Sequence, residues 1–168
     1  ITSDESWQWS EGPITRSWLC EADEDRRIDP GEEGWKPVAV VKGPAGRLVV
    51  QKEPPTRVQE TLCPISLENR DGTWVYTFDR EFTGFFRFRT SGPRGTAIRL
   101  ATRSIRENAP GIPARNFTCV LRGEGEEEFA PRQTYTAIAR VCVSGVARLP
   151  ALDDLVGCRV SGVGEVSG

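Results

Sequence analysis

Two carboxylates stand close together beside aromatic side chains, at Asp79 and Glu81. Side chains two residues apart on an extended strand project from the same face, so these two would share one surface. Two carboxyl groups separated by about 5 to 9.5 Å are the minimum equipment for hydrolysing a glycosidic bond. The same pair beside Arg80 equally suits the solvated rim of a turn, and both interpretations stay open at this point.

A second set of side chains has the types that sugar-binding sites use. An aromatic ring stacks on the apolar face of a pyranose, while charged and amide groups bind its hydroxyls. The candidates for such a ligand site are Trp18, Trp35, Trp74, Arg80, Arg87 and Arg103. Tryptophan is also a core residue, and the alternation of phenylalanine with arginine over 86–89 fits a half-solvated sheet face. It fits equally a concave surface for an apolar or anionic small molecule.

Composition excludes several kinds of chemistry. The 168 residues contain no histidine, which removes imidazole acid–base catalysis, serine–histidine nucleophile pairs and histidine-ligated metals. No CxxC pair occurs among Cys20, Cys63, Cys119, Cys142 and Cys158, so we predict no metal site, no cofactor and mostly buried, inert thiols. The net charge of −2 argues against binding to nucleic acid or to a membrane surface.

The cellular location stays undecided. No apolar run reaches the roughly 18 residues that a membrane helix needs, which predicts a soluble chain. The five cysteines and the glycosylation triplet at Asn116 do not distinguish a secreted from a cytoplasmic protein. A chain that starts at Ile1 and contains no methionine is expected to have lost a leader or to derive from a longer protein.

The elements that would position these residues are strands. Residues 1–55 are irregular, with β-branched runs at 35–41 and 47–51 around a proline and glycine turn, and predict an extended arm packing on the body. From residue 56 onward, apolar residues alternate with polar ones in short segments separated by turns. The segments are 57–62, 73–78, 84–90, 96–102, 116–121 and 140–146. This pattern predicts an all-β protein whose residues 56–168 form an antiparallel β-sandwich of jelly-roll or concanavalin-like type.

A series of collinear motifs runs through the chain, at 1–7, 12–14, 34–38, 54–58, 60–62, 64–66, 74–84, 92–96, 123–132, 134–135 and 152–155. Together, in this order, these segments resemble the non-catalytic β-sandwich region of large α-L-rhamnosidases. The chain departs from the family pattern at two places. It reads Tyr76-Thr77-Phe78-Asp79-Arg80-Glu81 where the family usually has Phe-Asp-Phe-Gly-Gln-Asn. It reads Thr134-Tyr135-Thr136-Ala137-Ile138-Ala139-Arg140 where the family usually has Thr-Tyr-His-Gly-Phe-Arg-Tyr.

This resemblance implies a sandwich that precedes a helical barrel, and in the family the barrel carries the catalytic carboxylates. The chain contains no such barrel, so we do not expect it to be a competent glycosidase. We expect an accessory sandwich that binds a sugar or another small molecule, with the missing barrel or a second copy of the chain as partner. The alternative is a small cofactor-free cyclase or isomerase, of the kind found in secondary metabolism, that reuses the sandwich cavity.

Overall fold

The computed structural model describes residues 4–18, 21–29, 31, 34–43, 45–106, 114–132 and 134–162. Within these ranges the chain forms twelve strands and one short 3₁₀ turn. They are β1 (Gln8–Trp9), β2 (Ile14–Trp18), β3 (Glu21–Asp25), β4 (Lys36–Pro37), β5 (Arg57–Leu62), β6 (Ser66–Arg70), β7 (Thr73–Ser91), β8 (Ala97–Arg103), β9 (Asn116–Val120), β10 (Glu126–Phe129), β11 (Thr136–Ser144), η1 (Leu152–Asp154) and β12 (Leu155–Ser161). No helix in these ranges has the length and apolar character needed to cross a membrane.

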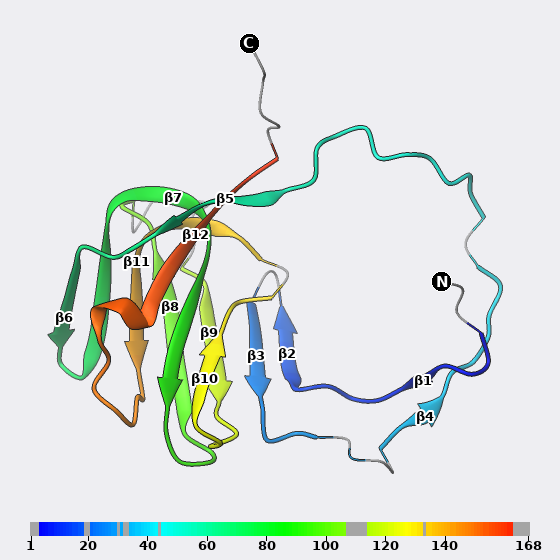
Figure 1. Cartoon of the computed structure of the whole chain (residues 1–168), viewed down its shortest axis with the longest axis horizontal. Coiled ribbons are helices and arrows are strands. Elements are labelled where there is room, and N and C mark those ends of the chain that lie inside the picture. The colour runs from blue at the N-terminus through cyan, green and yellow to red at the C-terminus, as the bar shows by residue number, and fades with distance from the viewer. Residues whose placement is uncertain are drawn as a thin grey trace.

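The long strand β7 belongs to both layers of the sandwich (Figure 1). Its first half pairs with β6 and with β11, and the larger layer continues through β8 and β9 to β3 and β2. Its second half, from Gly84 onward, pairs with β10 and β12, and β5 lies beyond β12. All these pairings are antiparallel except the one between β3 and β9. The predicted β-sandwich is therefore confirmed, with one parallel strand pair added.

The core lies between the two layers and is rich in aromatic rings. Alternate residues of β7 point inward, so that Tyr76 and Phe78 in its first half face Phe86 and Phe88 in its second. Phe86 contacts other rings at centroid distances of about 6 Å, as edge-to-face and tilted aromatic pairs do. The internal space near Phe88 has no room for a water molecule. The described core therefore gives no support to an enzyme that reuses a cavity in the sandwich.

The bend in β7 depends on a glycine. A Cβ atom at Gly84 would overlap the backbone carbonyl oxygen of Cys158 on β12. Because only glycine lacks this atom, residue 84 lets β12 approach β7 closely at the point where β7 passes from one layer to the other. Because β7 bends here without ending, the segments predicted at 73–78 and 84–90 are parts of one continuous strand.

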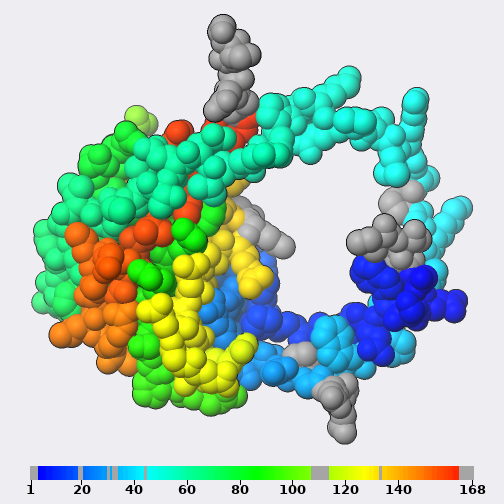
Figure 2. All heavy atoms as spheres, in the orientation of Figure 1, coloured from blue at the N-terminus to red at the C-terminus, as the bar shows by residue number. Residues whose placement is uncertain are grey.

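Different parts of the first 55 residues make different contacts with the sandwich. The strands β2 and β3 extend the larger layer, because β3 pairs with β9. The strands β1 and β4 form a separate two-stranded sheet, in which Lys36 lies over the ring of Trp9. The described residues of 38–56, which exclude position 44, contain no strand, although β-branched runs occur at 35–41 and 47–51. Figure 2 shows this exposed segment curving away from the sandwich and bounding an opening. The division into arm and sandwich at residue 55 stays a prediction.

The cysteines are only partly as predicted. Cys119 and Cys158 are buried thiols, and burial raises the pKa of Cys119 to about 11. Such thiols are poor nucleophiles, as the sequence predicted. Cys63 is exposed, so the expectation of burial is wrong there. Cys20 lies outside the described residues.

A buried ion pair closes the end of the sandwich next to η1. Both oxygens of Asp154 accept hydrogen bonds of 2.7 Å from Arg148, and the amide of Ala151 donates to one of them. Burial alone would raise the pKa of Asp154, but the hydrogen bonds from Arg148 and Ala151 outweigh it and lower the pKa. The ionised carboxylate therefore stabilises the folded chain.

The substitution Asp154→Asn is expected to lower the free energy of unfolding by about 3 kcal/mol at pH 7. This is the lower end of the range for a broken buried pair, because Arg148 is one-third exposed and can be hydrated. The pKa of Asp154 is lowered on folding, so the ion pair contributes fully to stability above the pKa of the unfolded state, about 3.9. The contribution is lost progressively as the pH falls from there through the lower pKa of the folded state. Urea unfolding at pH 7 and pH 3 should show the difference between the two proteins shrinking in acid.

The exposed neighbour Asp153 provides the matched control for this experiment. The substitution Asp153→Asn is expected to change stability by less than about 0.5 kcal/mol. If Asp153→Asn and Asp154→Asn had equal effects, the ion pair with Arg148 would have no special role.

Candidate functional site

The predicted carboxylate pair lies at the bend of β7. Asp79 and Glu81 both line a hollow of about 420 Å³, together with Arg80 and Arg140. Glu81 is half-buried, and its carboxylate accepts hydrogen bonds from the Ser104 hydroxyl and from the Ile105 amide. These contacts anchor the chain that follows β8. The two carboxylates thus line the same hollow, and the carboxylate of Glu81 is engaged by Ser104 and by the backbone of Ile105.

The tryptophans predicted to bind a ligand do not converge on one site. Trp18 ends β2 with 66% of its surface exposed, and Trp35 is exposed just before β4. Trp74 lies on β7 and packs against the core. The three rings therefore lie in different parts of the molecule and form no common stacking platform.

The predicted arginines are also separated from one another. Arg80 donates a 2.6 Å hydrogen bond to Glu60, which is shared with Arg159. Arg87 is exposed on the second half of β7, and Arg103 lies on β8 in the larger layer. Of the predicted site residues, the structure brings together only Asp79, Arg80 and Glu81.

A larger hollow lies elsewhere, where β3 meets the turn between β9 and β10. We call it the charged cleft, and its volume is about 500 Å³. Five carboxylates and three guanidinium groups line it, with two apolar side chains. The lining residues are Pro13, Glu24, Arg26, Ile28, Asp29, Arg122, Glu124, Glu126, Glu127 and Arg132.

Glu24 is the buried centre of the charged cleft. Its carboxylate is only 2% exposed, and it accepts hydrogen bonds from Arg132 at 2.9 Å and from Arg26 at 3.2 Å. Both of its oxygens are therefore paired with a cation, as a buried charge requires. The alternation of inward and outward residues along β3 places Glu24 on the same face as Ala22, which is also buried.

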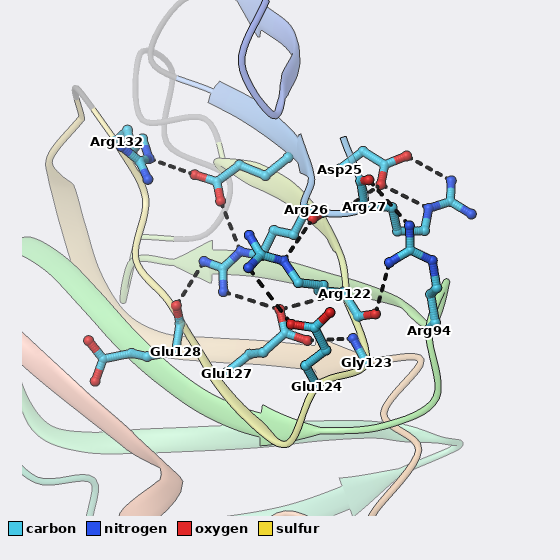
Figure 3. A network of polar contacts seen from close by, with 11 residues as sticks. Asp25, Arg26, Arg27, Arg94, Arg122, Gly123, Glu124, Glu127, Glu128 and Arg132 are labelled. Carbon is cyan, nitrogen blue, oxygen red and sulfur yellow. Dashed lines mark hydrogen bonds and ion pairs between the residues drawn. The ribbon is translucent and has the colours of Figure 1, made fainter. Parts of the chain in front are cut away.

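Arg26 connects β3 to β10. Its guanidinium group donates a 2.7 Å hydrogen bond to the carbonyl oxygen of Glu128 and lies 3.7 Å from the carboxylate of Glu127. It also lies 6.0 Å from the centroid of the Phe129 ring, which backs the cleft from the core side. Figure 3 shows Arg26 at the middle of the network, with contacts to residues from both strands.

The turn before β10 is held by Glu127. The backbone amides of Arg122 and Gly123 both donate to its carboxylate, at 3.3 and 3.0 Å. Gly123 has a φ of +87°, a conformation that L residues other than glycine rarely adopt. Arg122 in turn donates to the carbonyl oxygen of Arg26 (Figure 3). The polar groups of the cleft are thus fixed in place by contacts between distant parts of the chain.

An adjacent ion pair continues the network at the end of β3. Arg27 donates two hydrogen bonds to the carboxylate of Asp25, at 2.9 and 2.7 Å, and these lower the pKa of Asp25 to about 2. Arg94 donates to the carbonyl oxygen of Arg27. Asp25 is therefore ionised throughout the range in which the protein would be handled.

Sequence reasoning did not identify the charged cleft. The sequence contains a charged stretch at 21–27 and a run of glutamates at 126–128. The structure places these glutamates in β10, which pairs with β7. The available signal was the density of charged residues in both stretches, but no local pattern shows that two such distant stretches meet.

The cleft offers hydrogen-bond donors and acceptors side by side. Ionised carboxylates accept in pairs and guanidinium groups donate in a fork, an arrangement suited to adjacent hydroxyl groups. No group of three or more cysteine, aspartate or glutamate side chains in the described ranges is arranged to hold a metal ion.

The fold and the cleft define a β-sandwich domain of the concanavalin-like class. The chain belongs to the family described as the bacterial alpha-L-rhamnosidase concanavalin-like domain, whose model matches residues 67–161. This finding confirms the resemblance that the sequence motifs indicated.

Its relatives are much longer proteins. An alpha-L-rhamnosidase from Streptomyces avermitilis is 27% identical over 94% of this chain, which spans only 17% of that protein. A structure of the Streptomyces avermitilis alpha-L-rhamnosidase complexed with L-rhamnose superposes with a TM-score of 0.83 at 24% identity, covering 96% of this chain and 18% of the other. The structure of the native alpha-L-rhamnosidase from Aspergillus terreus superposes with a TM-score of 0.83 at 27% identity. The superposition covers 97% of this chain and 21% of the Aspergillus chain.

Proposed function

We propose that this chain acts as a non-catalytic accessory domain of an alpha-L-rhamnosidase and binds carbohydrate in the charged cleft. The family match and the small share of each relative that the chain spans support the first part. The fixed arrangement of carboxylates and guanidinium groups in the cleft is the observation that carries the second part.

The geometry of the cleft suits a polyhydroxylated ligand. Its buried pairs around Glu24 hold the floor rigid, whereas the side chains of Arg132, Glu126 and Glu124 at the rim are 60 to 71% exposed. A rigid site loses little conformational freedom when it binds, and this favours affinity. Ile28 and Pro13 supply apolar surface for the carbon face of a sugar ring.

L-Rhamnose and its oligosaccharides are the first ligands to test. The relatives are alpha-L-rhamnosidases, and one of the similar structures was determined with L-rhamnose. The resemblance of the sequence to this family implies that hydrolysis takes place in a helical barrel of the longer relatives, outside this domain. The engagement of Glu81 by Ser104 and Ile105 supports a structural role for that carboxylate.

The exposed segment 38–56 supports an association with a further domain. Leu48 is 99% exposed, and Val49 and Val50 are more than three-quarters exposed. Consecutive apolar side chains in water are typical of surfaces that contact another protein part. We propose that this segment packs against the rest of the longer protein.

Calorimetric titration of the chain with L-rhamnose and with rhamnose oligosaccharides tests the sugar site. The substitution Glu126→Ala removes an exposed carboxylate from the rim and is expected to weaken binding about tenfold, the equivalent of one hydrogen bond to a charged group. Glu128→Ala is the matched control, because Glu128 lies on the same strand but does not line the cleft. Absence of binding to these sugars, or equal losses in both variants, would overturn the proposal.

A further inference from the structure

We propose that the outer face of the larger layer carries a second binding site, which takes the oxyanion of an acidic sugar, either a carboxylate or a sulfate ester. The site is a groove of about 280 Å³ over β8, and we call it the arginine groove. It uses none of the residues that line the charged cleft. Failure of sugar binding in the cleft would therefore leave this inference standing.

The alternation of β8 builds the two walls of the arginine groove. Ile98, Leu100 and Thr102 point into the core, so Arg99, Ala101 and Arg103 point outward. All three outward residues line the groove. The small side chain of Ala101 leaves a hollow between the two arginines along the strand. A short floor between two guanidinium groups is an arrangement suited to an oxyanion.

Uncharged polar groups flank the floor on both sides. The strand register places Asn116 opposite Ala101 and Thr118 opposite Arg99 on β9. On β11, Ser144 lies opposite Arg99. The hydroxyl and amide groups of these residues can bind the sugar hydroxyls next to the acidic group.

Carboxylates are absent from the residues known to line the groove. The nearest ones along the sheet, Glu21 and Asp23 on β3, are already engaged. Their oxygens accept 2.8 Å hydrogen bonds from the amides of Asn116 and Thr118, and both pair with Arg16 on β2. The charges of Arg99 and Arg103 are therefore not neutralised from this side.

The two sites differ in the charges that line them. The described lining of the arginine groove holds Arg99 and Arg103 and no carboxylate. The charged cleft, by contrast, is lined by more carboxylates than guanidinium groups. The net charge of the sequence is near zero, so it does not reveal that positive and negative charges are concentrated at different sites. The two sites would therefore recognise different sugars of one polysaccharide. Guanidinium groups bind carboxylate and sulfate in a bidentate manner, which supplies both affinity and orientation.

The test is a titration of the ¹⁵N-labelled full chain with D-glucuronate, followed by NMR at constant ionic strength. The chain is produced in bacteria, so that Asn116 carries no glycan. We expect shifts of the amides of Ala101, Asn116 and Thr118, and none of these shifts with neutral L-rhamnose. Arg99→Gln and Arg103→Gln should each weaken binding about tenfold, the equivalent of one charge-assisted hydrogen bond.

Arg87→Gln is the matched control, because Arg87 is an exposed arginine in the middle of a strand of the other layer. It removes the same charge from the molecule and is expected to leave binding unchanged. If Arg87→Gln weakened binding as much as Arg99→Gln and Arg103→Gln, the loss would follow from the change in overall charge and the proposal would be overturned. A glucose 6-sulfate titration distinguishes the sulfate ester from the carboxylate. Inorganic sulfate that bound as tightly as both sugars would overturn the assignment to a carbohydrate.

Discussion

Replacing Gly84 by alanine is expected to lower the free energy of unfolding by about 3 kcal/mol or more, which is the upper end for an overpacked site. The added methyl group would overlap the carbonyl oxygen of Cys158, a backbone atom that cannot turn aside as a side chain can. Relief requires β12 to move away from β7. That movement would break pairing where β7 joins the two layers, between Gly84 and Arg159.

Urea unfolding followed by tryptophan fluorescence measures this loss. Gly12→Ala provides the control, because a Cβ atom there meets no other atom within 4 Å. It is expected to change stability by less than about 1 kcal/mol. A Gly84→Ala protein as stable as Gly12→Ala would show that β7 and β12 can separate at little cost.

Truncation of the Phe86 side chain is the second substitution that is expected to have a large effect on stability. We expect Phe86→Ala to lower the free energy of unfolding by about 3 to 5 kcal/mol, as for other buried phenylalanines. The ring is fully buried and contacts Phe117 of β9 and Phe129 of β10, with centroid distances of 6.0 and 6.1 Å. Its removal leaves a cavity between strands of both layers, which they can close only by shifting together.

The neighbouring residue Phe85 gives a matched control on the same strand. Its side chain points to the opposite face and is half-buried, so Phe85→Ala is expected to cost clearly less than Phe86→Ala. Thermal unfolding of both variants measures the difference. Equal losses would mean that the alternation along β7 does not divide core from surface.

The sequence predicted the sandwich because period two is a local signal. The segment 57–62 is β5, with the boundaries that were expected. The two segments expected at 73–78 and 84–90 are one strand, because Asp79 and Glu81 stand on a bend, where the register with β11 shifts, and not in a turn that ends the strand. The charged residues there are typical of a turn, and only the partners of β7 determine that the strand continues.

The candidate site was missed for a different physical reason. Arg132 and Glu24 form an ion pair although they are 108 residues apart in the sequence. No local pattern brings such residues together, since the pairing of β3 with β9 and of β10 with β7 determines their distance. The sequence named tryptophans for a stacking platform, but Trp74 is needed by the core and Trp18 stands alone at the end of β2.

The parallel contact of β3 with β9 delays the docking of the first hairpin of the sandwich. The carboxylate of Asp23 binds the amide of Thr118, which emerges from the ribosome 95 residues later. The hairpin of β2 and β3 is made early, but its docking edge does not exist until β8 and β9 are complete. Contacts of such long sequence separation slow folding. During synthesis one edge of the hairpin of β2 and β3 is therefore expected to stay unpaired until β9 has formed. Unpaired strand edges of this kind are bound by chaperones and by neighbouring chains.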